Sequence, residues 1–224
     1  MTATAVGTIT AVLFDWDGTL IDSRDALLAA WHESTEAVVG RRFPATAAEE
    51  REVFTLPGSE IWPRLTANAS QLEALVERFQ QAYERSGELV RPIPGVGAAL
   101  AELREAHVAI AVVTSKARRR YVLDARRAAL EDLIDVAVCA EDVAATKPDP
   151  RPVIAALELL DTRAANALMI GDTVVDVAAG LRAGTAVAGV LWGACTDQEL
   201  RDAGASVLLA DPRDLVALVA GGMQ

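Results

Sequence analysis

The sequence predicts an α/β fold in which a doubly wound parallel sheet is interrupted, just after its first strand, by a small all-helical insertion. Three observations support this fold class. Short apolar runs alternate with amphipathic helical patterns from residue 96 onward. Residues 24–89 show helical spacing without strand-like runs. An acidic turn, Asp15-Trp16-Asp17-Gly18, directly follows the first apolar run.

The strand pattern after the insertion gives the architecture of the core. Apolar runs with helical patterns between them predict a parallel sheet covered on both faces, in a Rossmann-like arrangement. We expect residues 1–22 and 90–224 to form this core and residues 23–89 to form a helical cap. Strands are expected at 11–14, 108–113, 136–139, 167–170, 186–191 and 206–209, and helices at 96–106, 117–129, 152–160, 174–183, 196–203 and from 211.

Composition limits the classes of function. The 224 residues, 52% of them hydrophobic, suffice for one large domain or one domain with a smaller insertion. No apolar run is long enough to span a bilayer, and residues 1–6 lack the pattern of a signal peptide. A cytoplasmic location and no membrane partner are therefore expected. The net charge of −11 argues against nucleic acid as a partner but allows a small phosphorylated substrate.

The acidic turn is the first candidate site. In extended backbone alternate side chains share a face, so Asp15 and Asp17 can point into one cavity while Trp16 points away. A buried carboxylate costs several kcal/mol unless a cation or a donor pairs with it. The turn therefore predicts a metal ion, a lysine or a reaction at this point.

Further polar groups follow the other apolar runs. Thr114 and Ser115 come after the second, Lys147 lies in the loop beyond the third, and Asp172 and Asp176 come after the fourth. Each alone fits an ordinary helix cap or turn. Because the carboxyl ends of parallel strands meet at one edge of a sheet, the sets together predict a single site there.

In order and spacing, these residues resemble the four motifs of the haloacid dehalogenase superfamily. The phosphoglycolate phosphatase-like members look most similar, since they share a helical cap after the first motif and the Lys-Pro-Asp-Pro run at 147–150. The resemblance implies a Mg²⁺-dependent phosphatase that hydrolyses a small phosphorylated metabolite, phosphoglycolate-like or a sugar phosphate, through an aspartyl-phosphate.

The resemblance also implies catalytic roles for the acidic turn. Asp15 matches the nucleophile that attacks phosphorus, and Asp17 matches the general acid and base. Asp15, Asp172 and the backbone carbonyl of Asp17 would bind Mg²⁺, which prefers oxygen ligands.

The remaining motif residues match phosphate-binding and supporting positions. Thr114, Ser115 and Lys147 would bind the phosphoryl oxygens, and Thr114 and Lys147 would thereby act as catalytic residues. Ser115 stands where related phosphatases often carry asparagine. Asp176 would support Lys147 or metal-bound water.

Two further segments allow two interpretations each. Lys116 and Arg118 to Arg120 could reach a second anionic group of the substrate or could lie on a solvated helix face. The segment Leu56 to Trp62 resembles the cap loop that faces the active site in this group, or is an ordinary helix connection. An insertion after the first strand is expected to cover the site and to select the leaving group.

Three other functions are compatible with parts of this pattern. A phosphomutase of the beta-phosphoglucomutase type resembles the core, but carries a histidine where this chain has Leu27. Those enzymes and phosphonoacetaldehyde hydrolases also use a cap lysine, and residues 24–89 contain no lysine. A non-catalytic binding protein on the same fold is the third, and the full set of motif residues argues against it.

Overall fold

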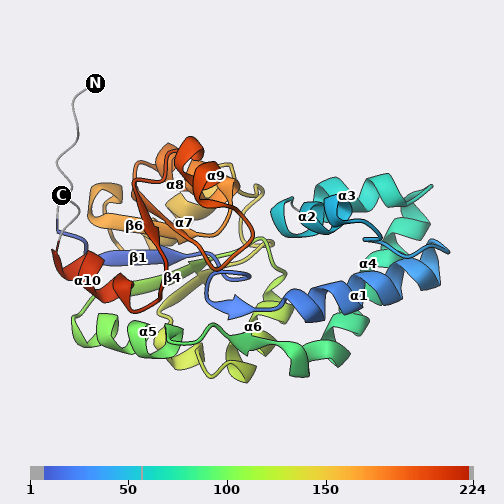
Figure 1. The fold of residues 1–224 in the computed structure, drawn as a ribbon, viewed down its shortest axis with the longest axis horizontal. Coiled ribbons are helices and arrows are strands. Elements are labelled where there is room, and N and C mark those ends of the chain that lie inside the picture. The colour runs from blue at the N-terminus through green and yellow to red at the C-terminus, as the bar shows by residue number, and fades with distance from the viewer. Residues whose placement is uncertain (1–7, 57, 222–224) are drawn as a thin grey trace. The chain divides into compact units, whose positions relative to one another are not determined.

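The computed structural model describes residues 8–56 and 58–221 of the chain. Within them, six parallel strands form one sheet in the order β5-β4-β1-β6-β7-β8 (Figure 1). The strands are β1 (Ala11–Phe14), β4 (Ala109–Val113), β5 (Val136–Val138), β6 (Ala167–Gly171), β7 (Ala186–Val190) and β8 (Val207–Leu209). From β1 the chain adds β4 and β5 on one side of the sheet and then β6, β7 and β8 on the other. Open α/β sheets bind their ligands at the point where the strand order reverses in this way, which here is beside β1.

The central strands are apolar because both of their faces are covered. All four residues of β1 have no exposed surface, and Leu13 lies opposite Ala111 of β4 and Met169 of β6. Burial of a side chain the size of Leu13 contributes about 1.5–3 kcal/mol. This continuous burial fixes the register, and with it the position of every side chain that follows the strands.

Helices cover the two faces of this sheet (Figure 1). On one side lie α5 (Val96–Glu105) and α6 (Arg118–Arg127), with α10 (Asp214–Gly221) beside α5. On the other side lie α7 (Arg151–Leu159), α8 (Val174–Ala183) and α9 (Asp197–Ala203). The short helices η2 (Glu131–Leu133) and η3 (Ala164–Asn166) lead into β5 and β6. The predicted doubly wound α/β fold is confirmed.

Residues Asp22–Arg91 form a second compact unit, separate from the flanking segments that make up the core. The chain passes between the units at β2 (Ile21–Asp22) and β3 (Arg91–Pro92). The helices of the unit Asp22–Arg91 are α1 (Arg24–Val38), α2 (Ala47–Thr55), α3 (Gly58–Leu65), α4 (Ala69–Arg85) and η1 (Ser86–Leu89).

Local sequence explains where two helices of this unit begin. The Thr46 hydroxyl accepts from the Glu49 N–H at 3.2 Å, and the Glu49 carboxylate accepts from the Thr46 N–H, which forms a capping box at the start of α2. The Asn68 side chain accepts from the Gln71 N–H at 2.9 Å at the start of α4. Each such cap stabilises a helix by about 1 kcal/mol.

Aromatic rings form the core of the helical unit. Trp31 of α1 stacks on Trp62 of α3 at a centroid distance of 4.1 Å, and it forms T-shaped pairs with Phe43 and Phe79. Trp62 also contacts Phe79 of α4, at 5.0 Å. Aromatic pairs of this kind contribute about 0.5–1.5 kcal/mol beyond the area they bury.

The prediction of a loop over Leu56 to Trp62 is wrong for most of that segment. Gly58–Leu65 is helix α3, with Pro63 inside it; Pro57 lies outside the described residues. Ile61 is 1% exposed and Trp62 stacks in the aromatic core. Packing of this apolar face outweighs the helix-breaking tendency of the proline.

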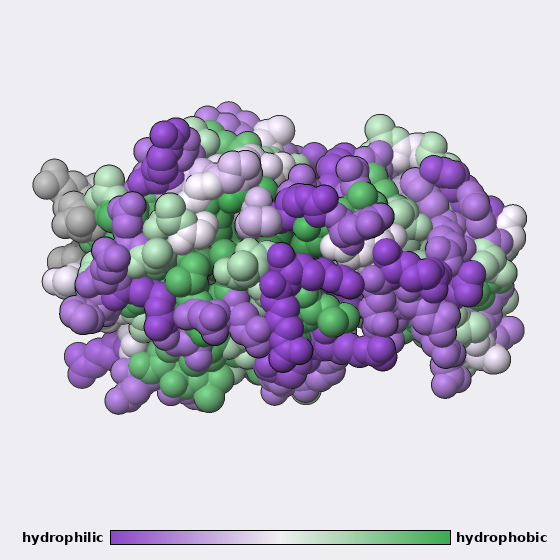
Figure 2. All heavy atoms as spheres, turned by 90° about the horizontal axis from the view of Figure 1, so that it is seen from below, coloured by the Kyte–Doolittle hydropathy of each residue, from purple (hydrophilic) through white to green (hydrophobic). Residues whose placement is uncertain are grey.

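The surface carries no candidate membrane segment: among the described residues, no helix is long and apolar enough to cross a bilayer. Hydrophilic residues predominate over the surface of the helical unit in Figure 2. Exposed ion pairs contribute to this surface, including Arg64 with Glu52 at 2.8 Å and Arg78 with Glu33 at 2.9 Å.

Candidate active site

The acidic turn after β1 is held by the neighbouring elements. The Asp15 N–H donates to the Ile170 carbonyl at 2.8 Å, which continues the pairing of β1 with β6. Trp16 is fully buried, and its ring meets Tyr121 of α6 edge-on at a centroid distance of 4.9 Å. The carboxylates on either side of Trp16 each pair with a lysine, Asp15 with Lys147 and Asp17 with Lys116.

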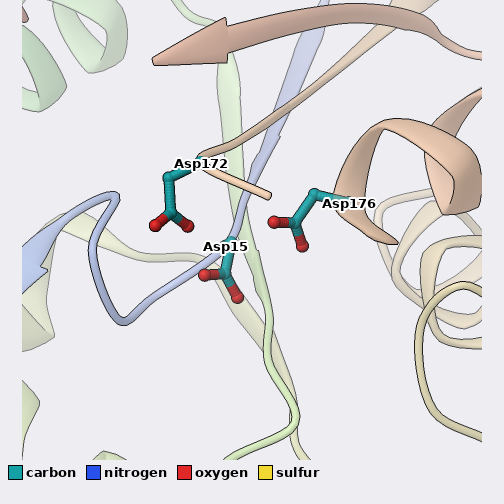
Figure 3. Close-up of side chains that lie close together, drawn as sticks. All are labelled: Asp15, Asp172 and Asp176. Carbon is teal, nitrogen blue, oxygen red and sulfur yellow. The ribbon is translucent and has the colours of Figure 1, made fainter. Parts of the chain in front are cut away.

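Three buried carboxylates converge at this edge of the sheet. Asp15 follows β1, Asp172 follows β6, and Asp176 lies in the first turn of α8. One carboxylate oxygen of each lies within 4.8 Å of the other two, and Figure 3 shows the side chains directed toward one another. Carboxylates this close repel one another unless positive charge lies among them.

Lys147 supplies such a charge. Its Nζ lies 2.5 Å from Asp15 Oδ1 and 2.6 Å from Asp176 Oδ1, and it donates to the Val113 carbonyl at 2.8 Å. The side chain is 4% exposed. The loop beyond β5 therefore places one fixed ammonium against carboxylates from β1 and α8.

The electrostatics of the cluster reflect its burial. Burial raises the pKa of Asp15 to about 7; Lys147 opposes this rise, and the charges of Asp176 and Asp17 add to it. Burial, with the charges of Asp15 and Asp176, also raises the pKa of Asp172 well above its usual value. Although burial lowers the pKa of Lys147, the neighbouring carboxylates raise it above its ordinary value. The cluster thus holds more negative charge than one lysine compensates.

The donor set fits a divalent cation. Asp15, Asp172 and Asp176 offer hard oxygen atoms, which Mg²⁺ prefers. Asp176 is already engaged at both oxygens: Oδ1 pairs with Lys147, and Oδ2 accepts from the Thr173 N–H at 3.0 Å and from the Thr173 hydroxyl. The groups that donate to Asp172, the Thr19 hydroxyl and the Ala194 N–H, are uncharged, so Asp172 is better placed than Asp176 to bind a cation.

Glycines allow the backbone to approach Asp172 closely. A Cβ atom on Gly18 would lie 2.4 Å from Asp172 Oδ2, and one on Gly193 would lie 2.1 Å from Asp172 Cβ. Gly18 also has φ 79°, in the left-handed region that glycine adopts without strain. Asp172 Oδ2 accepts from the Ala194 N–H at 2.8 Å. Larger residues at either glycine would displace this carboxylate.

Thr114 and Ser115 are brought to the same edge by β4. The Thr114 N–H donates to the Val138 carbonyl at 2.9 Å, which fixes the turn after the strand. Thr114 is 6% exposed, whereas Ser115 is exposed. Both line one pocket together with Lys147 and Cys139. Two hydroxyl-bearing residues and a lysine therefore line one pocket, and such groups can bind an anion.

Comparison with known proteins identifies the family. Residues 12–190 match the haloacid dehalogenase-like hydrolase family, and this range includes every polar group described above except those of the loop after β7. The chain belongs to that family. The resemblance found in the sequence is thereby confirmed.

Several known proteins are similar over most of the chain. Pyrophosphatase PpaX of Bacillus velezensis is 31% identical over 186 residues, which are 82% of this chain and 84% of the relative. A solved structure from Lactobacillus plantarum, described as a candidate phosphoglycolate phosphatase, has a TM-score of 0.84 at 25% identity and covers 95% of this chain and 100% of its own. A candidate beta-phosphoglucomutase from Thermotoga maritima has a TM-score of 0.77 at 26% identity, covering 96% and 100%.

One alternative interpretation of this hydrolase's sequence is wrong. Lys116 does not lie on a solvated helix face: it is 4% exposed, and its Nζ lies 2.7 Å from Asp17 Oδ1 and also bonds Asp124. Arg118, by contrast, is exposed and bonds Asp142 and the Ala137 carbonyl.

Sequence reasoning missed several residues around the hydrolase site. The Thr19 hydroxyl donates to Asp172 Oδ1 at 3.3 Å, and Trp192 Nε1 donates to the Thr19 carbonyl at 3.1 Å. Trp192 and Ala194 follow β7, so the rule that ligands bind beyond strand ends could have drawn attention to them. Asp124 gave no such signal, because it lies inside a helix rich in arginine.

Proposed function

We propose that this haloacid dehalogenase-like hydrolase is a magnesium-dependent phosphatase that acts on a small phosphorylated metabolite through an aspartyl-phosphate. The observation that carries the proposal is the position of the Lys147 ammonium, which lies between the carboxylates of Asp15 and Asp176. A nearby cation favours the ionised, nucleophilic form of a buried carboxylate. The same cation stabilises negative charge on a phosphoryl group that approaches that carboxylate.

In the first half of the reaction, a carboxylate oxygen of Asp15 forms a bond to phosphorus. The bond from phosphorus to the leaving oxygen breaks, and its electron pair stays on that oxygen. Asp17, two residues along the same turn, donates the proton that this oxygen takes up. The product is an aspartyl-phosphate on Asp15 and a free alcohol or phosphate.

In the second half, the ionised Asp17 takes a proton from water while the water oxygen bonds to phosphorus. The bond between phosphorus and Asp15 breaks, which releases inorganic phosphate and restores the Asp15 carboxylate. Throughout, the Thr114 hydroxyl, Ser115 and Lys147 are proposed to hold the phosphoryl oxygens, because these residues line one pocket.

Asp15, Asp172 and the backbone carbonyl of Asp17 are proposed to hold Mg²⁺. The support is the oxygen-rich donor set and the raised pKa values of Asp15 and Asp172, which an added cation would relieve. The ion supplies Lewis-acid stabilisation of the charge on the transferring group. We assign Asp176 to holding Lys147 in place, since its Oδ1 pairs with that ammonium and its Oδ2 accepts from the Thr173 N–H.

The substrate class follows from the family and from the similar proteins. A phosphate ester or anhydride with a small leaving group suits the core chemistry, and phosphoglycolate, sugar phosphates and pyrophosphate are the members to test first. Pyrophosphate is included because a pyrophosphatase is 31% identical to this chain. We assign selection of the leaving group to residues 23–89, a cap inserted directly after the catalytic strand.

The phosphomutase alternative has one supporting observation, the similar fold of the Thermotoga maritima protein. Against it stand Leu27 and the absence of lysine from residues 24–89 of the sequence. A phosphomutase would convert a sugar 1-phosphate into its 6-phosphate without net release of phosphate.

The test is a panel of phosphorylated compounds, with phosphate release ranked by kcat/KM in the presence of Mg²⁺ and with chelator. The panel contains pyrophosphate, phosphoglycolate, hexose phosphates, a nucleoside monophosphate and 4-nitrophenyl phosphate. We expect release that depends on Mg²⁺ and differs between substrates. Isomerisation of a hexose 1-phosphate without release would favour the mutase, and no turnover of any compound would favour a binding protein.

A further inference from the structure

A buried ion pair lies beside the acidic turn, apart from the residues that are proposed to hold the phosphoryl group. Lys116, which follows β4, bonds Asp124 in the middle of α6. Lys116 is 4% exposed and Asp124 has no exposed surface. The Lys116 ammonium also lies 2.7 Å from Asp17 Oδ1. One lysine thus joins a buried carboxylate to the carboxylate proposed as general acid and base.

Stability alone is a poor explanation for such a pair. Two charges lose their hydration on burial, and apolar residues of similar size often stabilise a core equally well. The side chain of Asp17 is 28% exposed, whereas the side chain of Lys116, taken without its backbone, is 2% exposed. A half-exposed carboxylate on a turn can adopt several rotamers, and the rigid ammonium favours the one that it contacts.

The elements that carry Lys116 and Asp124 are themselves fixed to the turn. The ring of Trp16, next to Asp17, packs edge-on against Tyr121, one helical turn before Asp124. The Lys116 N–H donates to the Thr114 hydroxyl at 3.1 Å, so the lysine backbone is also tied to the end of β4. The turn, the end of β4 and α6 therefore form one rigid assembly around Asp17.

We infer that Lys116 is a positioning residue that holds the Asp17 carboxyl group in the orientation for proton transfer, with Asp124 fixing Lys116. The inference rests on the proposed function, in which Asp17 protonates the leaving oxygen. Direct binding of a substrate anion by Lys116 is the competing role. It is disfavoured because the ammonium is buried and already contacts two carboxylates.

Leaving groups of different basicity separate these roles. Departure of 4-nitrophenolate needs little help from an acid, whereas phenolate and an alkoxide need a proton. The ratio kcat/KM includes the steps up to release of this first product, so it reports proton donation without the later hydrolysis of the intermediate. The substrates 4-nitrophenyl phosphate, phenyl phosphate and a simple alkyl phosphate carry no charge outside the phosphate, so the substrate charge stays constant across the series.

The variant to compare with wild type is Lys116→Met/Asp124→Leu, which removes both charges of the buried pair and leaves Asp17 in place. We expect kcat/KM to fall about 100-fold for the alkyl phosphate and less than about threefold for 4-nitrophenyl phosphate. The single variant Lys116→Arg keeps a cationic donor beside Asp17, so its kcat/KM for the alkyl phosphate should fall less than that of the double variant. Arg126→Met removes an exposed charge of α6 that pairs with Glu131, and should match wild type on all three substrates.

The outcomes distinguish the inference from the proposed function. A wild-type protein that hydrolyses none of the substrates overturns the proposed function, and the inference with it. Equal losses for all leaving groups, or no loss, in a folded double variant overturn the positioning role alone. A loss that appears only with substrates bearing a second anionic group assigns Lys116 to substrate binding instead. Should the double variant fail to fold by circular dichroism, Lys116→Gln carries the same comparison.

Discussion

The core unit and the helical unit differ most in where they place their charges. Among the described residues, every buried charged side chain belongs to the core unit and none to Asp22–Arg91. The helical unit instead packs aromatic rings inside and keeps its ion pairs on the surface. The buried charged residues of the core are Asp15, Lys116, Asp124, Lys147, Asp172 and Asp176.

This difference indicates which unit performs the chemistry. Exposed ion pairs contribute about 0–1 kcal/mol each, so the helical unit could lose any one of them at little cost. Buried charges cost several kcal/mol before they are paired, and a fold keeps them where a reaction or a metal needs them. Substitution of these buried charges should therefore lower catalysis, whereas substitution of the buried aromatic rings of the helical unit should lower stability first.

The largest expected effect is that of Asp15→Asn. Loss of the proposed nucleophile should lower kcat by about 10⁴-fold or more. The melting temperature should not fall, because the variant removes a carboxylate that is costly to bury. Phosphate release and circular dichroism measure the two quantities. Asp211→Asn, an exposed carboxylate paired with Arg213, is the matched control and should behave as wild type. Near-normal turnover by folded Asp15→Asn would refute the nucleophile assignment.

Lys147→Met tests whether the buried charges of the core unit serve catalysis, by removing the ammonium that pairs with Asp15 and Asp176. The variant leaves Asp15 and Asp176 without their shared partner, so kcat should fall by about 10²–10⁴-fold. The free energy of unfolding should fall as well, by about 3–5 kcal/mol, because buried carboxylates lose their compensation. Urea denaturation and steady-state kinetics measure these changes. A loss of stability without a loss of kcat would make Lys147 a purely structural residue.

The sequence predicted the core better than the helical unit, for a physical reason. Runs such as Ala11–Phe14 are buried on both faces, so their composition alone marks them as strands and places Asp15 at a strand end. Helix α3 was mistaken for a loop because its proline and glycine dominate local propensity, whereas its contacts with Trp31 and Phe79 are distant in sequence. Asp124 was missed for the same reason: only the fold brings it to Lys116.

The next prediction contrasts packing with recognition inside α3. Trp62→Ala removes a ring that stacks on Trp31, and should lower the free energy of unfolding by about 3 kcal/mol. Ser59→Ala and Glu60→Ala change exposed side chains of the same helix and should leave stability within about 0.5 kcal/mol. If residues 23–89 select the leaving group, these two variants should change kcat/KM unequally across the substrate panel. Equal effects on every substrate would place the specificity surface elsewhere.

A smaller effect concerns the stability of the metal-free core as pH changes. Burial raises the pKa of Asp15 from 3.8 to about 7, so between these values the folded state holds a proton that the unfolded state has lost. The free energy of unfolding should therefore fall as pH rises from about 4 to 7, on the order of 1–3 kcal/mol. Urea denaturation at pH 5 and pH 7, with chelator, measures it. The fall should shrink in Asp15→Asn, and Mg²⁺ should stabilise the protein more at pH 7 than at pH 5. A slope unchanged by Asp15→Asn would show that other groups cause the pH dependence.

The smallest expected effect is at Cys139, a thiol that lines the same pocket as Thr114, Ser115 and Lys147. Burial raises the pKa of Cys139 to about 11, and the side chain is 2% exposed, so little reactive thiolate is present at pH 8. Cys195 is also buried, at 5%. Titration with a thiol reagent should find close to none of the two cysteines in the native protein and both in urea. Activity should be unchanged by the reagent over the same period. Rapid modification of one thiol with loss of turnover would mean that the pocket opens to solvent, and that its buried charges are less sequestered than their contacts indicate.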